Sequence, residues 1–256
     1  MDRRSVLATG ALLGLAGLTR ARADPGPAVT VDGKIVLEAY RALVEEHLAA
    51  TLRALKALAA TSDARSGGWA QIRPALAAFA AEARSAAAVW IMAADGRYHT
   101  VAGGLQPETL KDRDYFPALV AGHDVHAALV LSKSTGHRSI VVAAPVMRAG
   151  RVVAALGVSV RARLVSELVD KRAELPASLV FYALDAGGRT AIHKDPARMF
   201  EFPSDLGDPS LKAAVRTILS KPAGQVDYSF RGSRRTAVFD SSPYTGWRFV
   251  LAAVRD

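Results

Sequence analysis

The chain has 256 residues, of which half are apolar and 22% are charged, and its formal net charge is +9. This composition is typical of a folded globular protein, and the length allows one large domain or two small ones. The absence of cysteine excludes disulfide bonds, thiolate metal sites and a cysteine nucleophile. The positive charge raises nucleic acid as a partner.

The N-terminus has the layout of an export signal. An Arg3-Arg4 pair is followed by an uncharged run, Ser5 to Thr19, and then by Ala21-Arg22-Ala23, which places small residues where a signal peptidase cleaves. This pattern predicts a signal peptide over residues 1–23 that resembles a twin-arginine signal. An uncleaved membrane anchor is the alternative. Cleavage would remove four arginines and one aspartate, which lowers the charge to +6. Because the remaining charges are scattered, we expect no nucleic-acid partner.

Two helices are predicted next. Apolar residues recur at helical spacing from residue 35 to 60 without an intervening glycine or proline, which indicates one long amphipathic helix. A second helix is expected over about residues 69–84, with Pro74 inside it. Residues 31–85 therefore form a helical spine. The long helix is also a candidate surface for a homodimer or another partner.

The rest of the chain contains two similar series of strands. In the first, strands near 89–92 and 98–101 flank an Asp95-Gly96 turn. A short helix or ordered loop is expected at 107–120, strands at 127–132, 139–146 and 152–160, and a helix at 163–172. In the second, strands at 179–184 and 190–193 precede a loop and short helix at 195–219, and strands at 224–230, 235–240 and 247–254 follow. This order predicts an α+β fold with two antiparallel-sheet modules, residues 86–175 and 176–256.

Several stretches resemble double Cache domains. Those similar to the membrane-distal module are Trp90–Thr100, Arg113-Asp114-Tyr115-Phe116-Pro117, Ser132–Gly136, Ala144-Pro145-Val146 and Gly150–Gly157; those similar to the membrane-proximal module are Phe181–His193 and Gly224–Leu251. The resemblance implies two PAS-like sheets stacked along one long N-terminal helix. It also implies extracytoplasmic sensing of a small molecule, usually in the distal module. Most relatives lie between two membrane spans, whereas this sequence ends without a second apolar run, so we expect a free-standing periplasmic sensor.

One arginine is the main candidate ligand contact. Within the resemblance, Arg113 lies in the loop that covers the distal sheet, where its guanidinium can bind a carboxylate through two parallel hydrogen bonds. Tyr115 would add a polar contact, and Tyr98 and Phe116 would form apolar walls. The alternatives are that Arg113 pairs with Asp112 or Asp114 and that Phe116 belongs to the core.

Three serines complete the predicted site. Ser132 and Ser134 are two residues apart and would face the same side of a strand, although a polar hairpin loop is an equal alternative. Ser159 stands where relatives that bind amino acids often have aspartate, and Glu108 stands where they have an aromatic residue. A neutral hydroxyl cannot balance a buried ammonium group. The sequence therefore predicts a small carboxylate or other anion as the ligand, and not an amino acid.

The remaining predictions concern function. None of the common catalytic motifs is present, so we expect no enzyme activity and no cofactor. His123 and His126 have no obvious third ligand, so no metal site is predicted. His193 is a minor candidate for a smaller pocket in the second module. The leading hypothesis is a periplasmic sensor that reports to a separate membrane receptor or kinase. The alternatives are an interaction module that binds no ligand but docks on a membrane receptor, and a solute-binding carrier.

Overall fold

The structure, a computed structural model, describes residues 32–255. The predicted signal peptide, residues 1–23, lies outside the described residues. The helices are α1 (Gly33–Ala59), α2 (Ser62–Arg65), α3 (Trp69–Glu82), α4 (Phe116–Val120), α5 (Ala162–Ala173) and α6 (Pro209–Ser220), with two 3-10 turns, η1 (Pro196–Arg198) and η2 (Pro203–Asp205). Within residues 32–255, none of the helices combines the length and the apolar character needed to cross a membrane.

The strands form two antiparallel sheets. The first contains β1 (Ala86–Ala93), β2 (Arg97–Thr100), β3 (Gly104–Thr109), β4 (Val125–Leu131), β5 (Arg138–Arg148) and β6 (Arg151–Arg161), in the order β3-β2-β1-β6-β5-β4. The second contains β7 (Leu179–Leu184), β8 (Thr190–His193), β9 (Ala223–Phe230), β10 (Ser233–Ser241) and β11 (Arg248–Arg255), in the order β8-β7-β11-β10-β9. Apart from β3, the two sheets have the same topology, which confirms the predicted α+β class with a long N-terminal helix and two PAS-like sheets.

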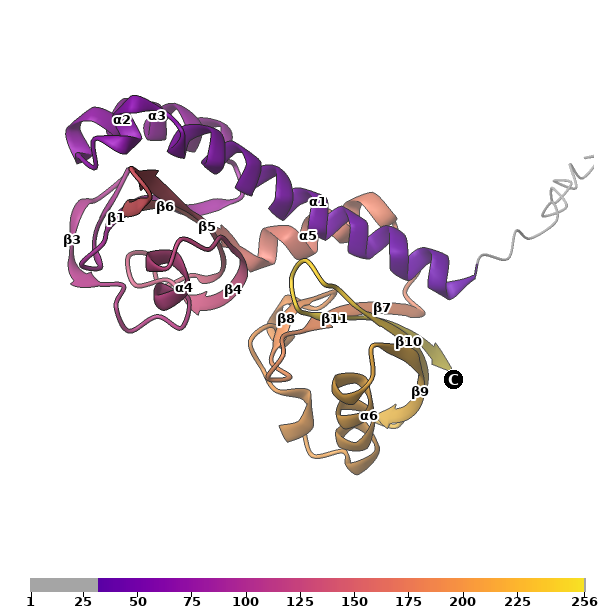
Figure 1. Cartoon of the computed structure of the whole chain (residues 1–256). Helices are drawn as coiled ribbons and strands as arrows, with labels where there is room; N and C mark the ends of the chain where they lie inside the picture. The colour runs from indigo at the N-terminus through magenta and orange to yellow at the C-terminus, as the bar shows by residue number, and fades with distance from the viewer. Residues whose placement is uncertain (1–31, 256) are drawn as a thin grey trace, which may run out of the picture. The chain divides into compact units, whose positions relative to one another are not determined.

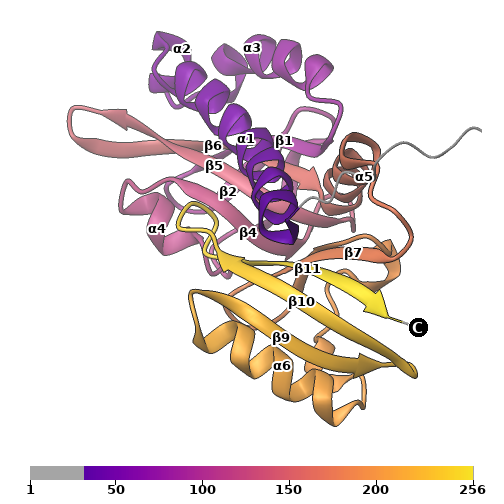
Figure 2. The same ribbon diagram turned by 90° about the vertical axis from the view of Figure 1, so that its right-hand side faces the viewer.

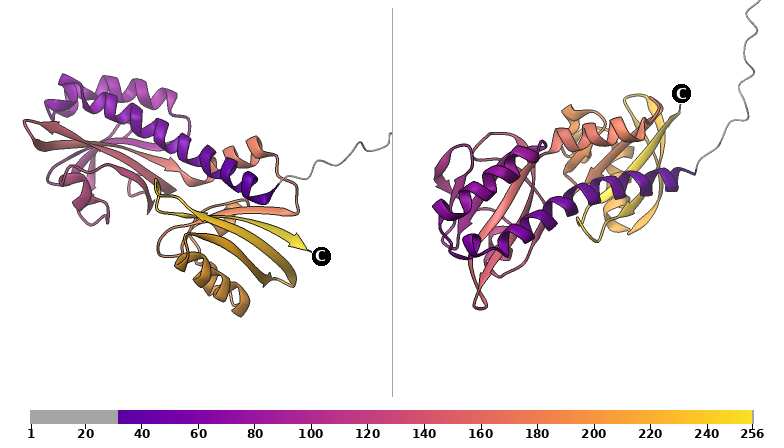
Figure 3. Two further views of the ribbon diagram at one scale, coloured as in Figure 1. Left: turned by 45° about the vertical axis from the view of Figure 1, so that its right-hand side comes forward. Right: turned by 90° about the horizontal axis from the view of Figure 1, so that it is seen from above.

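The long helix α1 contacts both sheets (Figures 1 and 3). It begins where the side chain of Asp32 accepts a hydrogen bond from the backbone N–H of Lys34 at 2.8 Å. Its buried side chains recur at helical spacing and join one hydrophobic core with residues of both sheets. The Tyr40 hydroxyl adds a buried hydrogen bond of 2.7 Å to the carbonyl oxygen of Tyr182. The apolar stripe of α1 is therefore covered by this chain, which leaves its polar face for any partner.

The prediction for residues 107–120 is partly wrong. Its first residues belong to the edge strand β3, which pairs with β2 through His99 and Leu105, and α4 occupies only its last part. Pro107 lies within β3. An edge strand tolerates proline because the missing N–H can point away from its one neighbour. The short helix expected in 195–219 is α6, which begins after an Asp208 side chain that caps its first turn.

Each sheet is covered on both faces. One face packs in the core that includes α1, and we call the opposite face the outer face. A separate apolar cluster lies on the outer face of the first sheet, beneath the segment that contains α4 (Figure 2). Another lies on the outer face of the second sheet, beneath α6. The fold therefore offers two equivalent places, one on each outer face, where a cavity can form between a sheet and its cover.

Candidate functional site

All seven predicted ligand residues lie at the outer face of the first sheet or in its cover. They come from four segments: β2, the loop that leads into α4 together with the first residue of α4, the turn between β4 and β5, and β6. Alternation along the strands places them there, since Tyr98 and the β6 residues Ala155, Gly157 and Ser159 share one face. The residues are Tyr98, Arg113, Tyr115, Phe116, Ser132, Ser134 and Ser159.

Arg113 links the segment that covers the outer face of the first sheet to the strand β4. Its guanidinium donates a hydrogen bond of 2.7 Å to the carbonyl oxygen of Leu131, at the end of β4. Its Nε atom is buried and has no hydrogen-bond partner. Within residues 32–255, neither Asp112 nor Asp114 forms an ion pair with Arg113. Asp112 pairs instead with Lys133 at 2.7 Å. Arg113 is therefore a cation with unused hydrogen-bonding capacity.

Hydroxyl groups gather beside this arginine. The Tyr98 hydroxyl lies near the Ser134 side chain, and burial raises the pKa of Tyr98. The Oγ atoms of Ser132 and Ser134 are 3.5 Å apart. Burial also raises the pKa of Tyr115, while the nearby positive charge of Arg113 opposes that rise. These phenols remain protonated at neutral pH, so they can donate hydrogen bonds to an anion.

The centre of the same outer face is filled. The indole ring of Trp90 lies against Gly157, where an added Cβ would meet Trp90 Cζ2 at 2.1 Å. Trp90 stacks on Tyr115 with ring centroids 6.4 Å apart, and both side chains are buried. Phe116 is partly buried against the same cluster. A cavity of about 360 Å³ lies beside this cluster, and Ser134 is the predicted residue that lines it.

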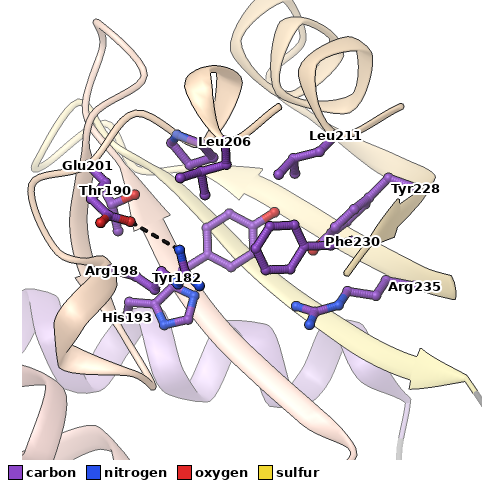
Figure 4. A pocket seen from close by; sticks show the side chains of 11 residues that line it. Tyr182, Thr190, His193, Arg198, Glu201, Leu206, Leu211, Tyr228, Phe230 and Arg235 are labelled. Carbon is purple, nitrogen blue, oxygen red and sulfur yellow. Dashed lines mark hydrogen bonds and ion pairs between the residues drawn. The ribbon is translucent and has the colours of Figure 1, made fainter. Parts of the chain in front are cut away.

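The outer face of the second sheet holds a smaller pocket of about 40 Å³. Figure 4 shows that its side chains converge from β7, β8, β9, β10, the segment that contains η1 and η2, and the start of α6. Three of these side chains are basic, three are aromatic and one, Glu201, is acidic; the other four are Thr190, Pro203, Leu206 and Leu211. The basic and aromatic residues are His193, Arg198, Arg235, Tyr182, Tyr228 and Phe230.

The two arginines of this pocket have different partners. Arg198 pairs with Glu201 at 3.3 Å (Figure 4) and with Asp195 at 3.8 Å. Arg235 stacks over Phe230 at 5.1 Å, but no carboxylate within residues 32–255 pairs with it, and its Nε is buried without a partner. Arg235 is therefore an uncompensated positive charge at a pocket.

Two neutral groups lie beside Arg235. The Tyr182 hydroxyl is buried and faces that of Tyr228, but its geometry leaves it without a hydrogen-bond partner. His193 stacks on Tyr182 with ring centroids 5.8 Å apart. Burial lowers the pKa of His193 to about 4. The imidazole is thus neutral at physiological pH.

Solved structures of similar fold include the ligand-binding regions of several receptors. The sensory domain of the chemoreceptor Tlp3 from Campylobacter jejuni, with isoleucine bound, has 13% identity and a TM-score of 0.64 over 87% of this chain and 91% of that one. The ligand-binding domain of the chemoreceptor CtaA from Pseudomonas fluorescens, in complex with L-serine, has 14% identity and a TM-score of 0.66 over 85% and 93%. An extracellular ligand binding receptor from Desulfohalobium retbaense has 14% identity and a TM-score of 0.65 over 86% of this chain but 40% of that one.

These chemoreceptor domains are of the double Cache type. The described chain has the double Cache fold. This confirms the resemblance found in the sequence. The present chain spans less than half of the Desulfohalobium receptor chain. Neither protein-family models nor curated protein sequences give a match.

In this double Cache fold, the second pocket is what sequence reasoning largely missed. Only His193 was considered there. A signal did exist, because Arg235 alternates with Ala237 and Phe239, which are buried on the outer face of the sheet. An arginine in phase with buried residues indicates a cation that faces the interior and needs a partner.

Proposed function

We propose that the protein is an exported, periplasmic sensor whose double Cache region binds a small anion and reports to a separate membrane receptor or kinase. The observation that carries this proposal is the position of Arg113. It lies among the hydroxyls of Tyr98, Ser132 and Ser134 and has no carboxylate partner within residues 32–255. A ligand carboxylate is the group that such a set of donors recognises best.

The charges of the cluster argue against an amino-acid ligand. Isoleucine and L-serine are bound by Tlp3 and CtaA, respectively, and each carries an ammonium group as well as a carboxylate. Here the acids of the cluster, Glu108 and Asp112, both pair with Lys133, at 3.2 and 2.7 Å. Ser159 offers only a neutral hydroxyl. An ammonium group at this site would remain unbalanced, which favours a carboxylate without an amine.

The proposed location rests on residues 1–23 and on the likeness to extracellular sensory domains. In this arrangement residues 86–175 are the main sensing module and residues 176–256 the second one. The separate partner is proposed from the likeness to the sensory domains of chemoreceptors. Its docking surface would include the polar face of α1, since the apolar stripe of that helix is already buried.

One observation favours a second candidate function. Trp90 and Tyr115 fill the centre of the outer face, as side chains of a module that binds no ligand would do. Such a protein would act as an interaction module that docks on a membrane receptor.

A panel of ligands separates the two functions. Short carboxylates, dicarboxylates and amino acids, including L-isoleucine and L-serine, are added to the purified chain, and the unfolding temperature is measured. A specific anion is expected to stabilise the protein by about 2.7 kcal/mol at a hundredfold excess over its Kd. Arg113→Gln should abolish that shift. Arg84→Gln, an exposed arginine on the loop after α3, is the matched control.

Two outcomes contradict the proposal. A shift with a free amino acid that depends on Arg113 would refute the preference for an anion without an amine. No shift with any anion, together with copurification of a membrane receptor, would support the interaction module instead.

A further inference from the structure

The pocket on the outer face of the second sheet has no role in the proposed function, yet it contains an uncompensated cation. Arg198 is neutralised by Glu201 and Asp195, at 3.3 and 3.8 Å. Arg235 has no such partner within residues 32–255, and the ring of Phe230 beneath it supplies only a cation–π contact. A guanidinium whose Nε is buried and unbonded is stabilised when an anion accepts its hydrogen bonds.

Two neutral groups at the pocket, the Tyr182 hydroxyl and the His193 imidazole, are also suited to bind a ligand that accepts hydrogen bonds. The Tyr182 hydroxyl is fully buried and has no partner, so its proton is available to a ligand. His193 accepts a hydrogen bond at Nδ1 from the backbone N–H of Asp195 at 2.7 Å. In the neutral ring this leaves the proton on Nε2, which makes that nitrogen a second donor. The polar groups not engaged elsewhere are thus mainly donors.

The remaining walls select the size and character of the ligand. Leu206 and Leu211 line the pocket together with Phe230, so an ion that is polar on all sides would lose hydration there without replacement. The pocket of about 40 Å³ holds only a few non-hydrogen atoms. A carboxylate with a short aliphatic chain meets both conditions.

We propose that this pocket is a second binding site, for a short aliphatic monocarboxylate of about two to four carbons. Its carboxylate accepts hydrogen bonds from Arg235 and from the Tyr182 hydroxyl, and its aliphatic chain packs against Leu206 and Leu211. The site uses no residue of the first sheet. The second site can therefore be confirmed or refuted independently of the function proposed above.

Calorimetric titration with propionate tests the site. The probe is added to the full exported chain and to three variants, and propionamide serves as the neutral isostere. Arg235→Gln should weaken propionate binding by about tenfold or more, which is the expected effect of losing a charge-assisted pair. Arg234→Gln is the matched control, because Arg234 is an exposed neighbour on the same strand. Arg113→Gln identifies any propionate bound at the first sheet, and the binding that depends on Arg235 should persist in this variant. Propionamide should not bind.

A second variant keeps the test decisive if Arg235→Gln does not fold. Tyr182→Phe removes one hydroxyl and is expected to lower the affinity for propionate by several-fold. In parallel, the ring resonances of His193 are followed by NMR, assigned with His193→Asn, and should shift on addition of propionate and not of propionamide.

Three results would overturn the second site. One is that the wild-type chain does not bind propionate at millimolar concentrations. Another is that Arg235→Gln and Tyr182→Phe both keep the wild-type affinity. The third is that binding is lost in Arg113→Gln alone, which would place the carboxylate at the first sheet, support the proposed function and refute this one.

Discussion

The outer faces of the two sheets have the same topology and differ in what lies beneath their covers. On the first sheet, Trp90 lies opposite Gly157 of the neighbouring strand, and its indole ring rests directly on that glycine. On the second sheet, Tyr182 occupies the equivalent strand and lies opposite Val250. A valine side chain does not let an aromatic ring lie against the backbone, so the second face keeps a pocket where the first is packed.

The arginines of the two faces differ in the same way. Arg113 donates to the carbonyl oxygen of Leu131 and so helps to hold the first cover in place. Arg235 has no carboxylate partner within residues 32–255. The Nε atoms of both arginines are buried without a partner, but only Arg113 donates to the main chain of a neighbouring strand. One topology thus yields a face whose centre is packed and a face that keeps a small pocket at its centre. The side chain opposite the aromatic residue decides which of the two forms.

Removing the indole ring should have the largest effect on this contrast. Trp90→Ala leaves a large cavity on the first outer face, and we expect it to lower the free energy of unfolding by about 3–5 kcal/mol. Urea denaturation measures the loss. Trp69→Ala, at a half-buried tryptophan that stacks on His99 at 5.0 Å, is the control and should lose less. Added indole should partly restore the Trp90→Ala protein; equal losses in both variants would show that Trp90 does not support the face.

The opposite change adds a methyl group at the same contact and should overpack the first outer face. In Gly157→Ala the new Cβ would lie within 2.1 Å of Trp90, so the ring must move. We expect a loss of about 3 kcal/mol from overpacking, measured by thermal unfolding. Gly33→Ala at the start of α1 is the control, since its Cβ would meet Val238 at an ordinary 3.7 Å. A Gly157→Ala protein as stable as wild type would mean that the ring has room to move.

The second face should make stability depend on pH through His193. Its pKa falls from 6.5 in the unfolded chain to about 4 in the folded one, because burial disfavours the charged ring. Between these values the unfolded chain binds more protons, so stability is lost as the pH falls from about 6.5 to about 4 and changes no further below that. The loss should be about 3 kcal/mol.

Chemical denaturation across this pH range, compared with His193→Asn, isolates the contribution. The asparagine side chain can still accept the backbone hydrogen bond but does not titrate. His137→Asn, at an exposed turn of the first sheet, is the control. If His193→Asn leaves the pH dependence unchanged, the histidine is not desolvated in the folded chain.

Much of this fold could be predicted because its signals are local. The apolar spacing of α1 and the Asp95-Gly96 turn, with Gly96 at a φ of 86°, are set by nearby residues. The strand β3 was missed because Gly104 and Pro107 are typical of loops, and only pairing with β2 makes the segment a strand. Edge strands formed by pairing with a distant partner carry little signal of their own.

The candidate sites show the same difference between contacts that are local in sequence and contacts that only the fold creates. Arg113 and Tyr115 are close in sequence, and the resemblance predicted a ligand contact for both. Tyr182 and Arg235 are separated in the chain by the strands β8 and β9 and the helix α6, and only the folded sheet brings them together. The packing of Trp90 on Gly157 could not be predicted either, because strand register decides which residue faces the ring.

The smallest expected effect is that of removing one tyrosine hydroxyl from each outer face. It tests the contrast between the two faces most directly, because the change in stability differs in sign between them. The hydroxyl of Tyr98 lies near the Ser134 side chain and is not among the buried polar atoms without a partner, so Tyr98→Phe should destabilise the ligand-free protein by about 1 kcal/mol. The hydroxyl of Tyr182 is buried without a partner. Tyr182→Phe should therefore leave stability unchanged or raise it by up to about 1 kcal/mol. Urea denaturation of both variants without ligand gives the two values. An equal loss in both would mean that the Tyr182 hydroxyl already has a partner within the protein, and that the second pocket is as fully satisfied as the first.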